Sequence, residues 1–170
     1  MTSLVSTSSP VQTRGAGTQD LARLERFISS YTSDGTLLPR SPANLILHVR
    51  DFQVAVAEGG LVGCGALQVV DASLAEIRSM AVDPEWRGRG IGSQILDALL
   101  VDAARLGLTR VFCLTRAPGF FAKHDFREVP KHRFPAKVWG DCLQCPRRAA
   151  CDEIAMERAV PIDTRPPQVA

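Results

Sequence analysis

The sequence predicts an α/β or α+β fold in which helices cover the faces of a central mixed sheet. Two features indicate this fold: strand-like segments joined by turns between residues 52 and 82, and a strand–helix–strand unit after them. With 170 residues, 45% of them hydrophobic and 22% charged, the chain has the composition of one folded domain. We expect that domain to span 11–160, between flexible tails at 1–10 and 161–170.

A helix is the first element that the pattern predicts. Thr18 suits the N-cap position, and apolar residues then recur at helical spacing as Leu21, Leu24, Phe27, Ile28 and Tyr31. The segment 33–35, Ser-Asp-Gly, breaks this helix. Two prolines in 37–42 predict a rigid loop after it.

Three strands follow the loop. Residues 52–57 alternate in hydrophobicity, and Glu-Gly-Gly at 58–60 is typical of a hairpin turn. Residues 61–70 form the second predicted strand, in which two glycines mark a bulge or a close packing contact. After a polar turn, residues 74–82 form the third strand.

The longest predicted helix begins near Ile91, and its apolar residues share one face as far as Leu106. Gly107 occupies the position of a C-terminal cap. Beyond it, we expect a strand at 109–115, a short helix at 118–124, and strands at 126–129 and 153–160. The basic segment between the last two strands carries three cysteines.

A turn rich in arginine and glycine, 87–92, joins the third strand to the long helix. Glycine lets the backbone approach a bulky anion, and the N–H groups of a helix's first turn attract such an anion. The turn lacks the Lys-Ser/Thr ending of a nucleotide-binding P-loop and the glycine spacing of a dinucleotide site. It therefore predicts a pyrophosphate site, with a tight turn bearing solvated arginines as the alternative.

The pattern Arg87-x-x-Gly90-x-Gly92, preceded by Met-Ala-Val-Asp-Pro at 80–84, resembles the signature of the GCN5-related N-acetyltransferase (GNAT) superfamily. The resemblance implies a GNAT fold, in which acetyl-CoA lies in a cleft where the strands at 74–82 and 109–115 splay apart. It also implies that the following residues bind the cofactor: Met80, Ala81, Val82, Arg87, Gly88, Arg89, Gly90, Ile91, Gly92 and Ser93.

Narrower signals resemble a short N-acetylglutamate synthase. They lie at 37–41, 51–52, 63–67, 75–82, 111–115, 120–126, 137–146 and 151–153. This resemblance implies transfer of acetyl from acetyl-CoA to the α-amine of L-glutamate, the first step of arginine biosynthesis. The alternatives are a GNAT enzyme for another amino acid or a peptide amine, and a non-catalytic acyl-CoA-binding regulator.

Candidate residues for glutamate are two arginines and a carboxylate. Glu76, Arg78 and Met80 alternate onto one face of their predicted strand, and Arg40 lies in the loop. The two guanidinium groups suit the two carboxylates of glutamate, and Glu76 suits the general base. Alternatively, the arginines are surface ion-pairing residues and Glu76 is a partner of Arg78. Thr115 either binds substrate or, as we favour, caps the next helix.

Two residues depart from the superfamily pattern. Many GNAT enzymes place a tyrosine, which protonates the departing thiolate, where this chain has Phe121, and its one tyrosine is Tyr31. The general acid is therefore unassigned. Asp125 takes a place that is often glycine, and aspartate tolerates left-handed φ better than most residues.

Three late cysteines offer a possible zinc site. Cys142, Cys145 and Cys151 supply three ligands, with His132 or His124 as a fourth. We favour buried thiols in a helical excursion, because a full four-ligand signature is missing.

Composition excludes several other classes. A net charge of +2 argues against nucleic acid as a partner, and no apolar run has the length of a membrane span. The N-terminus has no hydrophobic signal core, so we expect a cytoplasmic protein. The expected partners are the small molecules acetyl-CoA and L-glutamate, and a homodimer is expected by analogy with the superfamily.

Overall fold

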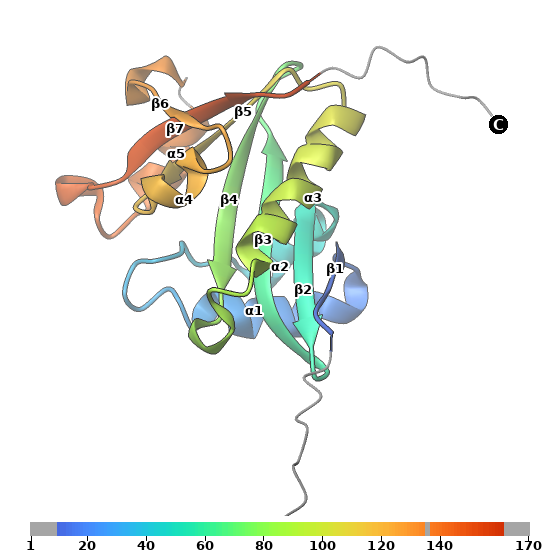
Figure 1. Cartoon of the computed structure of the whole chain (residues 1–170). Helices are drawn as coiled ribbons and strands as arrows, with labels where there is room; N and C mark the ends of the chain where they lie inside the picture. Colours follow the sequence, from blue (N-terminus) through green and yellow to red (C-terminus); the bar gives the residue numbers. More distant parts are fainter. Residues whose placement is uncertain (1–9, 135–136, 162–170) are drawn as a thin grey trace, which may run out of the picture.

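The computed structural model describes residues 10–134 and 137–161, which contain one seven-stranded sheet (Figure 1). The strand order is β1-β2-β3-β4-β5-β7-β6, and every pair is antiparallel except β4–β5. The strands are β1 Gln12–Gly15, β2 Phe52–Ala57, β3 Gly60–Val69, β4 Leu74–Val82, β5 Arg110–Thr115, β6 Arg127–Glu128 and β7 Ile154–Ala159. The helices are α1 Leu21–Ser29, α2 Pro42–His48, α3 Ile91–Arg105, α4 Pro118–Ala122 and α5 Lys137–Leu143. Short 3-10 turns lie at Thr18–Asp20, Val49–Asp51, Pro84–Trp86, Lys131–Arg133 and Arg148–Ala150.

Helices cover both faces of the sheet, as the sequence predicts. On one face, α3 buries an apolar side against the central strands, and on the other α1 and α2 pack over β2 and β3 (Figure 1). A third apolar cluster lies at β5 and β7, where the rings of Phe112 and Phe134 stack with centroids 3.9 Å apart. The fold class is that of a mixed α/β sheet.

Two elements were not expected. β1 is a polar four-residue edge strand without alternating hydrophobicity, and it forms because β2 offers a free edge. α2 begins at Pro42, where the sequence predicts a rigid loop. Proline suits the first turn of a helix, and the hydroxyl of Ser41 caps that turn by accepting a hydrogen bond from Asn44 N–H at 3.1 Å.

The first helix begins later and ends earlier than predicted. Residues Thr18–Asp20 form a 3-10 turn, so Thr18 does not cap the α-helix. The Asp20 carboxylate instead accepts from Gly17 N–H at 2.9 Å and pairs with Arg14 at 2.6 Å. The helix ends at Ser29, which leaves Tyr31 beyond it. The other predicted elements lie within two residues of their observed bounds.

The parallel strands β4 and β5 separate halfway along their length. They pair only at Leu74–Arg110, Ala75–Val111 and Glu76–Phe112. From Ile77 onward, β4 pairs with β3 alone, while β5 continues alongside β7. This splay leaves a gap in the sheet next to the N-terminus of α3, and it agrees with the predicted cleft.

A bulge in β4 corrects one expectation about its faces. The register between β3 and β4 shifts between Cys64 and Ala66, and Ser79 takes a left-handed φ of 51°. Side chains after the bulge therefore change faces. Met80 packs with the α3 cluster, so it does not share the face of Glu76 and Arg78 as simple alternation predicts.

Candidate active site

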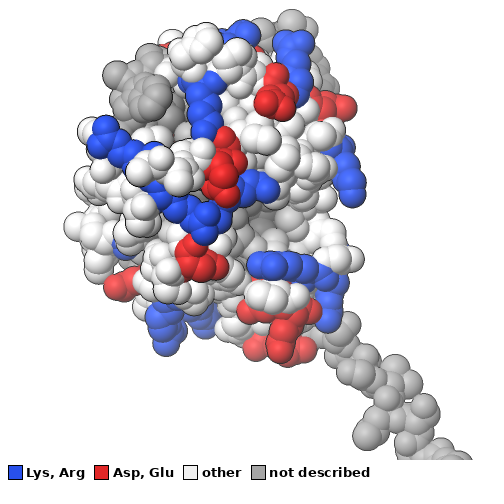
Figure 2. All heavy atoms as spheres, turned by 90° about the vertical axis from the view of Figure 1, so that its left-hand side faces the viewer, with Lys and Arg blue, Asp and Glu red and all other residues white. Residues whose placement is uncertain are grey.

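A cavity of about 840 Å³ opens where β4 and β5 separate. Its walls are β4, the start of α3, α4, the loop 35–40 and part of α5. Figure 2 views the side of the molecule that carries this loop and α5, where acidic and basic side chains intermingle. The predicted site residues that line the cavity are Arg40, Glu76, Arg78, Met80, Ala81, Val82, Arg87, Gly88, Gly90, Ile91, Gly92, Ser93 and Thr115.

The glycine turn directs the first turn of α3 at the cavity. Gly90 is the N-cap residue with φ 78°, a conformation that costs a side-chain-bearing residue about 1–2 kcal/mol. Gly92 lies close to the Phe120 ring, since a Cβ there would be 3.3 Å from it and the ring would have to shift slightly. The N–H groups of Ile91, Gly92 and Ser93 have no acceptor within the helix, so they suit an anion.

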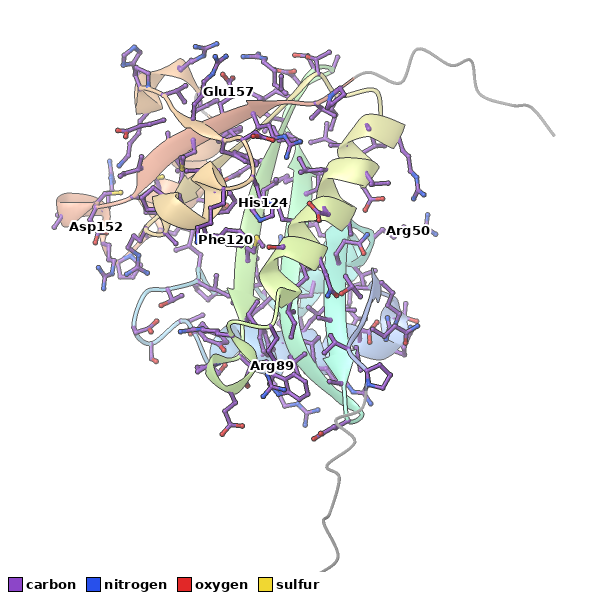
Figure 3. The ribbon with its side chains drawn as sticks, in the orientation of Figure 1. Arg50, Arg89, Phe120, His124, Asp152 and Glu157 are labelled. Carbon is purple, nitrogen blue, oxygen red and sulfur yellow. The ribbon has the colours of Figure 1, made fainter. Side chains whose placement is uncertain are left out.

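The two arginines of the turn are held differently. Arg87 lines the cavity, and its Nε donates to the Val82 carbonyl at 3.1 Å. Arg89 does not line it: its guanidinium stacks 4.6 Å from the Trp86 ring centroid and donates to the Glu85 carbonyl (Figure 3). Arg87 is thus placed to contact a ligand, whereas Arg89 braces the turn.

A serine–histidine contact lies beside the α3 N-terminus. Ser93 Oγ and His124 Nε2 are 2.9 Å apart, and Asp97 Oδ1 lies 3.8 Å from His124 Nδ1. The imidazole lies beside Phe120 at a centroid distance of 5.0 Å (Figure 3). Sequence reasoning considered His124 only as a metal ligand, because nothing local connects α4 to α3.

At the other end of the cavity, two arginines converge on one carboxylate. Asp141 Oδ2 accepts from Arg78 Nη1 at 2.7 Å and from Arg40 Nη2 at 3.4 Å. The side chains of Arg40 and Arg78 are 9% and 14% exposed, whereas that of Asp141 is 41% exposed. Burial and the neighbouring Arg40 lower the pKa of Arg78. Sequence reasoning did not single out Asp141.

Glu76 lies at the point where the two strands part. It is the last β4 residue paired with β5, and its side chain lines the cavity between strand and loop. Burial raises its pKa from 4.5 to about 7, although nearby Arg78 acts in the opposite direction. A carboxylate with such a pKa suits proton transfer near neutral pH.

Comparison with known proteins identifies the family. The model of the acetyltransferase (GNAT) domain matches residues 49–128. An uncharacterized N-acetyltransferase of Chlorobaculum tepidum is 41% identical over 147 residues, 86% of this chain and 95% of that protein. This chain belongs to the GNAT N-acetyltransferases.

Other comparisons place this GNAT enzyme among the amino-acid acetyltransferases. An amino-acid acetyltransferase of Mycobacterium tuberculosis is 40% identical over 131 residues, 75% of each chain. The structure of N-acetylglutamate synthase from Neisseria gonorrhoeae, complexed with coenzyme A and N-acetyl-glutamate, superposes with a TM-score of 0.78 at 26% identity. That match covers 91% of this chain and 36% of the other.

This GNAT chain departs from the superfamily pattern at Phe121. Phe121, which lines the cavity, offers no proton, and Tyr31 is not among the lining residues. Thr115 Oγ accepts a hydrogen bond from Ala117 N–H at 2.9 Å. The sequence predicts Thr115 as the cap of α4, but the N-cap residue is Ala117, so Thr115 stabilises the turn before the helix. Asp125 adopts φ 62°, the left-handed conformation that its position requires.

The late cysteines of this GNAT chain lie within α5 and in the segment after it. Cys142 and Cys145 line the cavity, and burial raises the pKa of Cys142. Lys131 Nζ donates to Cys151 Sγ at 3.3 Å. Across residues 10–134 and 137–161, no three His, Cys, Asp or Glu side chains are arranged to hold a metal ion. Over the same ranges, no helix has the length and apolarity to span a membrane.

Proposed function

We propose that this enzyme transfers acetyl from acetyl-CoA to the α-amine of L-glutamate. The main support for this proposal is that Arg40 and Arg78 converge on a single carboxylate oxygen. These two nearly buried cations therefore form a binding site that suits a carboxylate. With two carboxylates, glutamate offers one partner to each guanidinium. The same activity would serve as the first step of arginine biosynthesis.

The proposed reaction uses the two ends of the cavity. The N–H groups at the start of α3 and the Arg87 side chain would hold the pyrophosphate of acetyl-CoA. Backbone groups near Met80 and Val82 would bind the pantetheine arm. The uncharged α-amine attacks the thioester carbonyl carbon, the C–N bond forms, and the C–S bond breaks to release the CoA thiolate. Glu76 takes the proton that the amine loses, directly or through a water.

Relatives support this choice of acceptor. The Mycobacterium tuberculosis relative is named amino-acid acetyltransferase, and the Neisseria gonorrhoeae structure binds N-acetyl-glutamate together with coenzyme A. The unpaired Nε of Arg40, buried without a hydrogen-bond partner among the described residues, is a further donor for a substrate carboxylate. Acetylases of one fold accept different amines, so the acceptor pocket and not the fold must decide the substrate.

An acceptor panel tests the proposal. Purified protein with saturating acetyl-CoA is assayed for CoA-thiol release with glutamate, glutamine, aspartate and a peptide amine. We expect turnover of glutamate, and we expect Arg40→Ala and Arg78→Ala each to lower kcat/KM for glutamate about ten- to a hundredfold. That factor corresponds to a lost charge-assisted contact of about 1.5–3 kcal/mol.

Arg50→Ala is the matched control, because Arg50 is exposed and lies far from the cavity (Figure 3). Acetyl-CoA affinity should remain unchanged in all three variants. Wild-type kinetics in both pocket variants would show that these arginines do not bind glutamate. Turnover of the peptide amine without turnover of glutamate would show that the enzyme transfers acetyl groups but that glutamate is not its acceptor.

A further inference from the structure

An internal carboxylate occupies the place proposed for the carboxylate of the substrate. Asp141 belongs to α5, whereas its two partners come from the loop after α1 and from β4, 101 and 63 residues away in sequence. Its Oδ2 takes a hydrogen bond from each guanidinium. Any acceptor carboxylate that uses both arginines must therefore compete with this side chain.

The internal carboxylate satisfies its partners unequally. The contact with Arg78 is 2.7 Å, near the ideal for a charged pair, but the contact with Arg40 is 3.4 Å. Arg40 Nε, buried in the cavity wall, has no hydrogen-bond partner among the described residues. A free carboxylate, which is not tethered to a helix, can approach Arg40 through Nε and Nη2 together and satisfy both donors.

Asp141 is more exposed to solvent than either of its two partners. Its side chain is 41% exposed, so water can hydrate the carboxylate when it leaves the two arginines. A second polar contact joins the segment after α5 to the segment after α1, where Arg147 Nη2 donates to the Asp34 carbonyl at 3.2 Å. Both contacts are polar, whereas Cys142, the residue after Asp141, packs against the apolar cluster at β5 and β7. The exchange therefore needs only the Asp141 side chain to leave the arginines, while α5 stays packed.

We propose that Asp141 is a specificity-determining residue that competes with the acceptor for Arg40 and Arg78. Glutamate, which offers one carboxylate to each guanidinium, replaces Asp141 on both, whereas a neutral amino acid has only its α-carboxylate and can replace it on one. The enzyme thereby rejects neutral amino acids at the cost of weaker binding of glutamate. The apparent affinity for glutamate equals its intrinsic affinity multiplied by the fraction of molecules in which Asp141 has left the arginines. This inference rests on the proposed function.

Glutarate provides a test that does not depend on acetyl transfer. It has both carboxylates of glutamate and no amine, so calorimetry in the presence of CoA measures binding alone. We expect Asp141→Asn and Asp141→Ala to bind glutarate about three- to tenfold more tightly than wild type, because the competitor is neutral or absent. KM for glutamate should fall by the same factor, and KM for a neutral amino acid should fall by at least that factor, because the variants no longer reject it.

Asp152→Asn is the matched control. It makes the same chemical change in the segment after α5, but Asp152 lies at the outer edge of the molecule, outside the cavity lining (Figure 3). Its pairing with Arg147 at 3.6 Å joins two exposed side chains, so its loss should not alter glutarate binding. Circular dichroism and melting temperature establish that each variant is folded.

Two results would overturn the inference. Weaker glutarate binding in both Asp141 variants would mean that Asp141 orders the arginines for the ligand. Unchanged binding would mean that it does not compete. If glutamate is not acetylated but the variants still bind glutarate more tightly, the proposed function fails and the competition by Asp141 stands.

Discussion

Replacing Glu76 with glutamine should make the protein more stable and less active at pH 8. Burial raises the pKa of this carboxyl to about 7, so ionisation is less favourable in the folded chain than in the unfolded one. The stability associated with the neutral form is fully present below pH 4.5 and is lost as the pH rises through about 7. Glutamine is neutral at every pH, so a protein with glutamine at this position does not lose this stability as the pH rises.

The magnitude follows from the two pKa values of Glu76. Their difference, from 4.5 to about 7, corresponds to about 3 kcal/mol at about 1.4 kcal/mol for each pH unit. Glu76→Gln should therefore raise the free energy of unfolding by up to about 3 kcal/mol at pH 8. At pH 5, where the folded carboxyl is already neutral, the gain should fall to about 1 kcal/mol. For a domain of this size, 3 kcal/mol is about 6–12 °C in melting temperature.

Melting temperatures at pH 5 and pH 8 test this reasoning. Glu128→Gln, at an exposed position on β6, removes a carboxylate without this burial and should melt like wild type at both values. In the same samples, kcat of Glu76→Gln should fall by about 10²- to 10⁴-fold, the usual contribution of a general base. An equal gain in melting temperature at the two pH values, or none, would refute the burial argument. Wild-type kcat would refute the role of Glu76 as base.

Two further predictions concern the turn before α3 and the N-terminal edge. Gly90→Glu should abolish acetyl-CoA binding, because a strained residue and a negative charge would occupy the anion site; unchanged affinity by calorimetry in folded protein would disprove the pyrophosphate assignment. Asp20→Ala should destabilise the protein by about 1.5–3 kcal/mol, since it removes the charge-assisted hydrogen bonds that the buried carboxylate accepts from Arg14. Acetyl-CoA affinity should be retained in Asp20→Ala, and a melting temperature within 2 °C of wild type would contradict this account.

Local chemistry explains why most elements could be predicted from the sequence. Hydrophobic periodicity identifies β2 and α3, since burial of one face requires it, and the turns on either side identify β3, which is buried on both faces. The turn before α3 could also be predicted, because the positive φ at Gly90 favours glycine and a side chain at Gly92 would crowd the Phe120 ring. Two elements with weaker local patterns were not predicted. β1 forms by pairing with the edge of β2, and the Ser-Pro pair that begins α2 is as typical of a loop as of a helix start.

The site itself was only partly determined by the sequence. Local pattern and family resemblance nominate Arg40, Glu76 and Arg78 as site residues, but they do not bring the two arginines together or place Asp141 between them. Those contacts join segments 63 and 101 residues apart, and no local pattern encodes such a distance. The face of Met80 depends on a bulge, because one extra residue reverses a period-two pattern. Likewise, the raised pKa of Glu76 exists only once folding removes its water.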